Sequence, residues 1–429
     1  MFVAQLDRSW LETPFSSHGF EINDHEQIGL LRKFCKHVYV DTVRSSVPEA
    51  AILRAHESAD ADQDPFASPN NVGSAGRSHS FGRKILSSLG RLDPTGLVVR
   101  RVDQHASFPR TTTVEKEIPE AIAAYRHARK RMRWISARVG KGANIDIDVL
   151  KEAADPLIDS ILRNPDALGG LGYLRKYKVG NVRYSVDTAI WALMLGRHMG
   201  FDGQRLRTLA MGSLLLDIGN ARLPESIVTH EGPLSPEESD IMRMHVDYGV
   251  EIAVKSPGVS DDIVSMIECH HERSDGSGYP SGMQHDDIPV FGRIAGVADC
   301  YDAMISHLPY AAARSSYDAV RELNAMAGGQ FQREIVEHYI QAVGMFPTGS
   351  LLELNTGEVA LVVEQNPMRR LRPKLLVLLD GEKRPLRQRR QLNLARCPAN
   401  AGQRKARWIV AGFEAGAFGI NPIDIFVGQ

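Results

Sequence analysis

The stretch at residues 268–280, Glu-Cys-His-His-Glu-Arg-Ser-Asp-Gly-Ser-Gly-Tyr-Pro, constrains this chain more than any other. It begins at the end of an apolar run with helical spacing, and Gly276 and Gly278 then favour a tight turn because they lack a Cβ. His270 and His271 stand at this junction, and neutral imidazoles are the commonest metal ligands in proteins. Taken alone, such a pair is more often a surface turn after a core helix than a metal site.

Outlying residues favour the metal site. Asp217 ends an apolar helix-like run, and a buried carboxylate in such a place needs a partner. His245 lies on a helix whose start is indicated by Ser235 as N-cap and by Glu238, which would close a capping box. Asp299 lies in a further helix-like run. Carboxylates and imidazoles in one set are typical of a transition-metal site.

The order of these residues resembles that of an HD-GYP domain, from about residue 173 to residue 345. The resemblance is carried by Asp217, His245, the histidine pair, Asp299 and the loop Asp275-Gly276-Ser277-Gly278-Tyr279-Pro280. HD-GYP domains are a subgroup of the HD phosphohydrolases, all-helical enzymes that hydrolyse the bacterial second messenger cyclic di-GMP with a two- or three-metal centre. The resemblance therefore implies a mainly α fold and a cyclic di-GMP signalling protein of the phosphodiesterase type.

The resemblance also implies which residues hold metal. Asp217, His245, His270 and His271 match the family's ligands for one ion. The ligands for the other ion are reduced to Asp217 and Asp299, because Leu216 stands where the family has the histidine of its His-Asp pair. We expect these two carboxylates to be insufficient for catalysis. The expected cofactor is one divalent transition metal (iron, manganese, zinc or nickel), without a two-metal centre.

Four other positions depart from the family pattern. Tyr184 replaces a histidine of the first core helix, and Asn220 replaces a lysine near the metals and the substrate phosphate. Leu308 and Ala311 replace two arginines that reach the phosphates of the ligand, and such bidentate contacts are the ones that Arg makes best. We therefore expect weakened binding of cyclic di-GMP.

Two functions remain open at this point. In the first, the chain is a catalytically impaired phosphodiesterase homologue that acts by binding the nucleotide or a partner, such as a diguanylate cyclase docked on the loop at residues 275–280. In the second, it is an active cyclic di-GMP phosphodiesterase with an unusual metal set, for example one ferric ion bound by Tyr184 as phenolate. The sequence does not choose between a nucleotide sensor and a protein scaffold.

Smaller modules flank this domain. Residues 1–54 predict a small α+β module that resembles the uncharacterised domain often found before HD-GYP domains. Residues 55–95 are poor in large apolar side chains and predict a flexible linker. The remaining expected parts are a helical connector (96–165), the HD-GYP domain (166–345), a small β appendage with strands near 351–352, 359–363 and 375–379, and a basic C-terminal tail (384–429).

The connector contains a predicted helix at residues 119–139. Its apolar residues follow spacings of three and four: Ile118, Ala121, Tyr125, Ala128, Met132, Ile135 and Val139. This face predicts either packing on the chain's own domain or the seam of a homodimer, and the pattern favours neither.

Charge and composition exclude several other classes. Lys and Arg number 51 against 52 for Asp and Glu, and the basic tail lacks interleaved aromatic residues apart from Trp408, so nucleic acid is not expected as a partner. Four scattered cysteines indicate a reducing compartment. No apolar run reaches transmembrane length, and no signal peptide is evident. These features predict a cytoplasmic protein without a membrane partner.

Overall fold

The structure is a computed structural model that describes residues 2–6, 20–21, 38–41, 108–175, 186–230, 232–306, 313–366, 371–397, 406–414, 416–421 and 425. It divides the chain into two units, residues 1–103 and 104–429. The linker expected at residues 55–95 lies outside the described residues, as do Tyr184, Leu308 and Ala311.

The first unit contains a small antiparallel sheet. Its strands are β1 (Phe2–Leu6), β2 (Phe20–Glu21) and β3 (Val38–Asp41), in the order β2-β1-β3. These strands supply the β part of the module expected at residues 1–54.

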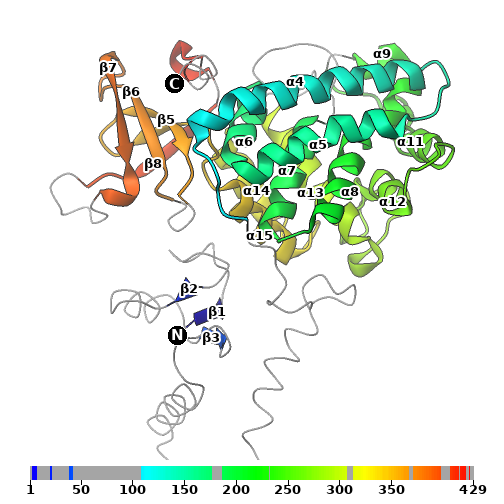
Figure 1. Ribbon diagram of the computed structural model, residues 1–429, viewed down its shortest axis with the longest axis horizontal. Coiled ribbons are helices and arrows are strands. Elements are labelled where there is room, and N and C mark those ends of the chain that lie inside the picture. Colours follow the sequence, from blue (N-terminus) through cyan, green and yellow to red (C-terminus); the bar gives the residue numbers. More distant parts are fainter. Residues whose placement is uncertain are drawn as a thin grey trace, which may run out of the picture. The chain divides into compact units, whose positions relative to one another are not determined.

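Helices dominate the second unit (Figure 1), and the mainly α fold is confirmed. They are α4 (Val114–Val139), α5 (Ile147–Arg163), α6 (Pro165–Arg175), α7 (Val186–His198), α8 (Gly203–Leu215), η3 (Ile218–Arg222), α9 (Glu225–Val228), α10 (Pro236–Arg243), α11 (His245–Val254), α12 (Asp261–Cys269), η4 (His285–Asp287), α13 (Val290–Ile305), α14 (Ser316–Ala325) and α15 (Arg333–Val343). The central helix is α7, which is buried on nearly every side and packs against α8, α13 and α15. Within the described residues, none of these helices has the length and apolar character of a bilayer-spanning segment.

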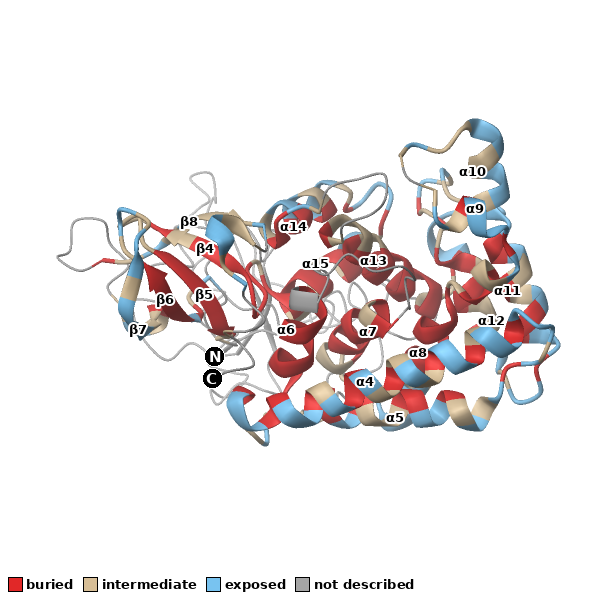
Figure 2. Cartoon of the chain, turned by 90° about the horizontal axis from the view of Figure 1, so that it is seen from above, coloured by how far each residue is buried: buried red, intermediate tan, exposed pale blue. Residues whose placement is uncertain are grey.

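The connector helix is longer than expected. It begins at Val114, where the side chain of Thr113 accepts a hydrogen bond from the Lys116 backbone, rather than at residue 119. Its predicted apolar face is fully buried, and α4 packs along α5 and α6. Figure 2 shows buried and exposed residues alternating along α4. The chain's own helices therefore occupy the face that could have formed a homodimer seam.

The helix expected to begin after Ser235 and to carry His245 is divided in two. The predicted capping box of Ser235 and Glu238 is present at the start of α10. The helix then breaks at Met244, whose backbone N–H turns back to the carbonyls of Ile241 and Met242. His245 consequently opens a new helix, α11, and its side chain is buried.

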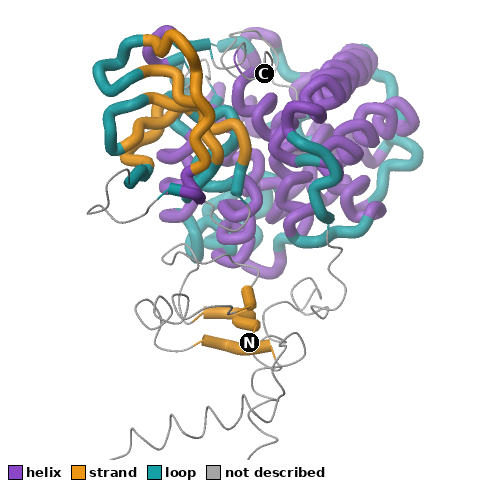
Figure 3. The backbone as a smooth tube through the Cα atoms, turned by 60° about the vertical axis from the view of Figure 1, so that its left-hand side comes forward, coloured by secondary structure: helices purple, strands orange, loops and turns teal. Residues whose placement is uncertain are grey.

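The β appendage is a five-stranded antiparallel sheet (Figure 3) with strand order β7-β6-β5-β4-β8. Its strands are β4 (Leu351–Leu354), β5 (Val359–Glu364), β6 (Lys374–Leu379), β7 (Pro385–Asn393) and β8 (Ile409–Phe413). The last two lie in the segment expected as a basic tail. Leu386 and Leu392 of β7 pack against the apolar core while its arginines stay exposed, and charged residues of this kind are typical of an edge strand.

Candidate metal centre

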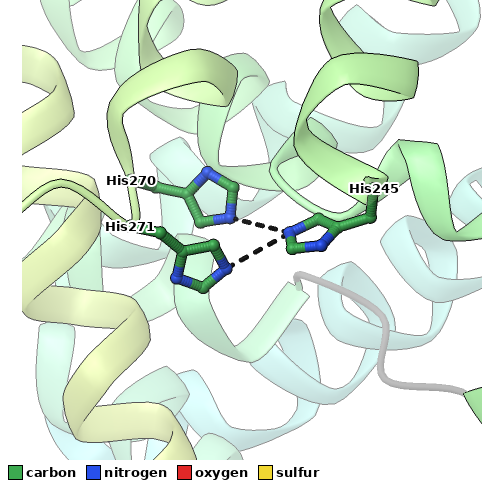
Figure 4. A group of neighbouring side chains, drawn as sticks. All are labelled: His245, His270 and His271. Atoms are coloured by element: carbon green, nitrogen blue, oxygen red, sulfur yellow. Dashed lines mark hydrogen bonds between the residues drawn. The ribbon is translucent and has the colours of Figure 1, made fainter. Parts of the chain in front are cut away.

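Three histidines converge inside the helical domain (Figure 4). The Nε2 atom of His245 lies 3.2 Å from Nε2 of His271 and 3.4 Å from Nε2 of His270. Among the described residues, this triad is the group whose ligand atoms gather closely enough to hold an ion, all within 4.8 Å of one another. The structure thus brings together the three imidazoles that the sequence suggested.

Close packing of three elements sets this geometry. His245 opens α11, while His270 and His271 follow directly after α12, and the two helices pack together. The turn η3 packs on α11 so closely that a Cβ at Gly219 would lie 1.9 Å from the His245 carbonyl oxygen. Only glycine permits this approach. It places Asp217, the residue before η3, beside the triad.

Hydrogen bonds on the far side of the rings orient two ligands. Nδ1 of His245 donates to the carbonyl of Met242, and Nδ1 of His270 donates to the carbonyl of Ile267, both at 2.7 Å. Such bonds to backbone carbonyls are common for metal-binding histidines, because they fix the tautomer and leave Nε2 with its lone pair. Burial and the neighbouring His245 lower the pKa of His270 to about 4, so its ring is neutral near pH 7.

The residues of the site fit a bound cation. When both Nδ1 atoms donate to backbone carbonyls, the Nε2 atoms of His245 and His270 face each other at 3.4 Å. Two lone pairs at this distance repel unless a positive charge, either a proton or a metal ion, stands between them. A transition metal ion coordinated by the three Nε2 atoms would remove the repulsion.

The carboxylates take two different positions. Oδ1 of Asp217 lies 3.7 Å from Nε2 of His245, at the edge of the triad. Asp299 is buried on α13. The pKa of Tyr279 is raised mainly by burial and further by the negative charges of Asp299 and Asp217. Neither carboxylate belongs to the tight group of three imidazoles.

Two of the departures from the family pattern fall on described residues. Leu216 is fully buried and offers no donor atom next to Asp217. Asn220 lies in η3, and within the described part of the chain its buried Oδ1 has no hydrogen-bond partner. The positions that would supply a histidine and a lysine in an HD-GYP domain are thus occupied by an aliphatic and an uncharged side chain.

The loop after the histidines is held by a buried carboxylate. Glu272 accepts hydrogen bonds from the backbone N–H groups of Ser281 (2.7 Å) and Met283 (3.0 Å). A Cβ at Gly278 would lie 2.4 Å from the Arg273 backbone nitrogen, so the loop folds back onto its own start. Asp275 accepts from the backbone and hydroxyl of Ser277. Sequence reasoning missed Glu272, because an acidic residue in a glycine-rich loop is usually solvated.

Tyr279 connects the loop to the triad. Its ring stacks on His271 with centroids 4.6 Å apart, and its backbone N–H donates to the His271 carbonyl at 3.3 Å. The guanidinium of Arg243, the last residue of α10, lies 5.2 Å from the centre of the Tyr279 ring. Neither contact could be read from the sequence, because Arg243 and Tyr279 lie on separate elements.

Comparison with known families and proteins agrees with this geometry. Residues 171–335 match an HD domain, residues 1–150 match a domain of unknown function (DUF3391), and residues 351–399 match a KOW domain associated with HD domains. The helical triad region, the N-terminal module and strands β4 to β7 therefore each correspond to a recognised domain.

Several curated relatives share the HD region. A protein named cyclic di-GMP phosphodiesterase from Pseudomonas aeruginosa is 27% identical over 89% of this chain and 83% of its own length. A cyclic di-GMP phosphodiesterase from Thermotoga maritima is 34% identical over 34% of this chain and 40% of its own length. A 3'3'-cGAMP-specific phosphodiesterase from Vibrio cholerae is 35% identical over 35% of this chain and 29% of its own length. This chain spans less than half of the last two.

The motif order, the domain matches and the relatives together define the class of this protein, an HD domain protein with an N-terminal DUF3391 module. Within that class, these matches support the resemblance to the HD-GYP family.

Proposed function

We propose that this protein is a cytoplasmic HD-GYP protein that holds one divalent transition metal ion at the triad, binds cyclic di-GMP or a related cyclic dinucleotide there, and hydrolyses it poorly. One observation carries the proposal. The ligand atoms of three imidazoles lie within 4.8 Å of one another, while Leu216, next to Asp217, is a buried aliphatic residue without a ligand atom.

Metal binding is supported by the chemistry of the donor set. His245, His270 and His271 would hold the ion, with Asp217 beside them. Three imidazoles and a carboxylate suit iron, manganese, zinc and nickel. A bound ion would act as a Lewis acid toward a phosphate oxygen.

Poor hydrolysis follows from the second half of the site. Two-metal phosphodiester hydrolysis needs two ions a few ångströms apart, one for the attacking oxygen and one for the leaving oxygen. Asp217 and Asp299 are the carboxylates that the family pattern assigns to a second ion, while Leu216 adds no ligand atom and Asn220 adds no positive charge. Two carboxylates without an imidazole bind a transition metal weakly.

The nucleotide class is suggested by the relatives, which are named for cyclic di-GMP or 3'3'-cGAMP. A phosphodiester carries a negative charge that a metal ion attracts. The loop at residues 275–280 remains a proposed docking surface for a signalling partner such as a diguanylate cyclase, since Asp275 and Ser277 stand on its outer side while Glu272 holds its base.

The proposal is tested by measuring metal content and turnover in one preparation. We expect at most one tightly held transition metal per chain, loss of that metal in His270→Ala, and little cyclic di-GMP hydrolysis with added iron or manganese. The Thermotoga maritima relative, which is named as a cyclic di-GMP phosphodiesterase, serves as the positive control for turnover. Two or three ions per chain together with turnover at the rate of that relative would overturn the proposal in favour of an active phosphodiesterase with an unusual metal set.

A further inference from the structure

The negative charge around the three histidines opposes the binding of an anionic nucleotide. Asp217 lies beside His245, and the negative charges of Asp217 and Asp299 both help to raise the pKa of Tyr279. A cyclic dinucleotide bound at the triad would add phosphodiester anions to this negative charge. A single metal ion compensates only part of this negative charge. A cationic side chain close to the triad would therefore contribute strongly to nucleotide binding.

Two arginines exert their charge on Tyr279, Arg243 and Arg273. Arg273 is already engaged. Its Nη1 atom donates to the carbonyls of His270 (3.3 Å) and Glu272 (2.8 Å), and its guanidinium lies 4.8 Å over the ring of Phe331. Arg273 thus supports the loop and cannot turn toward a ligand without breaking these contacts.

Arg243 is placed differently. Its side chain is 59% exposed, and its ion pair with Asp240 is an exposed i,i+3 contact at 3.7 Å, which contributes little. Its guanidinium lies 5.2 Å from the centre of the Tyr279 ring, which in turn stacks on His271. Arg243, Tyr279 and His271 therefore form a continuous line from solvent to a ligand of the triad.

We propose that Arg243 binds a phosphodiester group of the cyclic dinucleotide, as the solvent-side cation of the site. This inference rests on the proposed function. A guanidinium offers parallel N–H donors that match a phosphate, and breaking the long pair with Asp240 costs little. The contact comes from the end of α10, whereas the family's phosphate arginines correspond to Leu308 and Ala311 in a different segment.

The test compares cyclic di-GMP binding by calorimetry in metal-loaded, full-length variants. Arg243→Gln should weaken binding at least tenfold and lower its salt dependence, while Arg243→Lys should fall between it and the wild type. Arg207→Gln is the matched control, because Arg207 is similarly exposed and also pairs with one carboxylate, Asp155, on the α5–α8 surface. It should bind like the wild type. Metal content should be the same in all four proteins.

Three outcomes would contradict the proposed role of Arg243. Wild-type protein that holds its metal but does not bind cyclic di-GMP would overturn the nucleotide part of the proposed function, and this role of Arg243 with it. Tight wild-type binding that Arg243→Gln leaves unchanged would overturn the inference alone. Equal loss of nucleotide and metal in the Gln and Lys variants would also overturn it, since Arg243 would then act by supporting the Tyr279–His271 stack.

Discussion

At the scale of single residues, His270 shows how position determines chemistry. The ring is fully buried, its Nδ1 donates to the Ile267 carbonyl, and His245 stands across from its Nε2. Burial and the neighbouring imidazole both disfavour the charged ring, and together they lower its pKa to about 4. The neutral form is the one that binds a metal ion.

This shift predicts how stability depends on pH in the metal-free protein. The pKa of His270 is about 4 when folded and about 6.5 when unfolded. Between these values the unfolded chain takes up a proton that the folded chain excludes, so stability is fully present above pH 6.5 and falls toward pH 4. The loss is about 3 kcal/mol. Urea denaturation of chelator-treated wild type and His270→Gln should show it, with a shallower dependence in the variant. The same pH dependence of the free energy of unfolding in both proteins would contradict the lowered pKa of His270.

Leu216 allows the missing ligand to be restored. Leu216→His should let the protein take up a second metal equivalent without much hydrolysis, because Tyr184 and Asn220 remain. The buried imidazole should cost about 1–3 kcal/mol of stability before metal is added. Leu215→His is the control, since Leu215 is equally buried and should destabilise without adding an ion.

The repair can be extended. Leu216→His with Tyr184→His and Asn220→Lys should give measurable cyclic di-GMP hydrolysis, and Leu308→Arg with Ala311→Arg should then act mainly on KM. A folded fivefold variant that binds two ions but has no activity would show that other residues around the site also differ from those of an active phosphodiesterase.

At the scale of elements, the site depends on how closely η3 approaches α11. Gly219 lies against the backbone of His245 and Gly249, where no side chain can be accommodated. The contact holds Asp217 beside the triad, although the two elements are separated by α9, α10 and their loops.

Gly219→Ala should therefore be strongly destabilising and should weaken metal binding. Its Cβ would overlap backbone atoms that cannot move independently, and we expect a loss of at least about 2 kcal/mol. Gly203→Ala is the matched control, because a Cβ at the start of α8 meets no atom within 4 Å. Thermal unfolding and metal titration of both variants would measure the difference. A normal metal affinity in Gly219→Ala would mean that the position of η3 is unimportant for the triad.

At the scale of the second unit, a buried charge cluster joins the helices to the sheet. Asp166 at the start of α6 is buried, and it pairs with Arg110 at 2.9 Å and accepts from the Gln365 backbone at 3.0 Å. Arg110 also donates to the Gln365 carbonyl at 3.1 Å. Gln365 directly follows β5, so the cluster ties the five-stranded sheet to the helical domain.

Arg110→Met should leave the Asp166 carboxylate buried without its partner. The expected cost is about 3–5 kcal/mol, because an uncompensated buried charge is far worse than a neutral site. The double variant Arg110→Met with Asp166→Asn should recover part of this loss. Denaturant unfolding would compare the two, and limited proteolysis would show whether the sheet is released first. Equal stability of Arg110→Met and the wild type would show that the charge cluster does not stabilise the attachment of the sheet to the helical domain.

Local patterns in the sequence determined the helices, the capping box of Ser235 and Glu238, and the identity of the histidines. These features depend on residues a few positions apart, such as the apolar face of α4 and the glycines after His271. The same reasoning placed residues 384–429 in a tail, since the arginines of β7 outweigh Leu386 and Leu392 in a local reading. The strand is recognisable only once β6 lies beside it.

The tertiary structure alone decided which candidate ligands meet. The three imidazoles converge because α11 begins anew at His245 and packs against α12, whereas Asp217 lies beside His245 and Asp299 does not belong to the group. Glu272 became a loop anchor, and Arg243 became the cation over Tyr279, through contacts with residues on other segments. Such contacts depend on distances between elements. These distances follow from close backbone packing at Gly219 and Gly278 rather than from the order of residues along the chain.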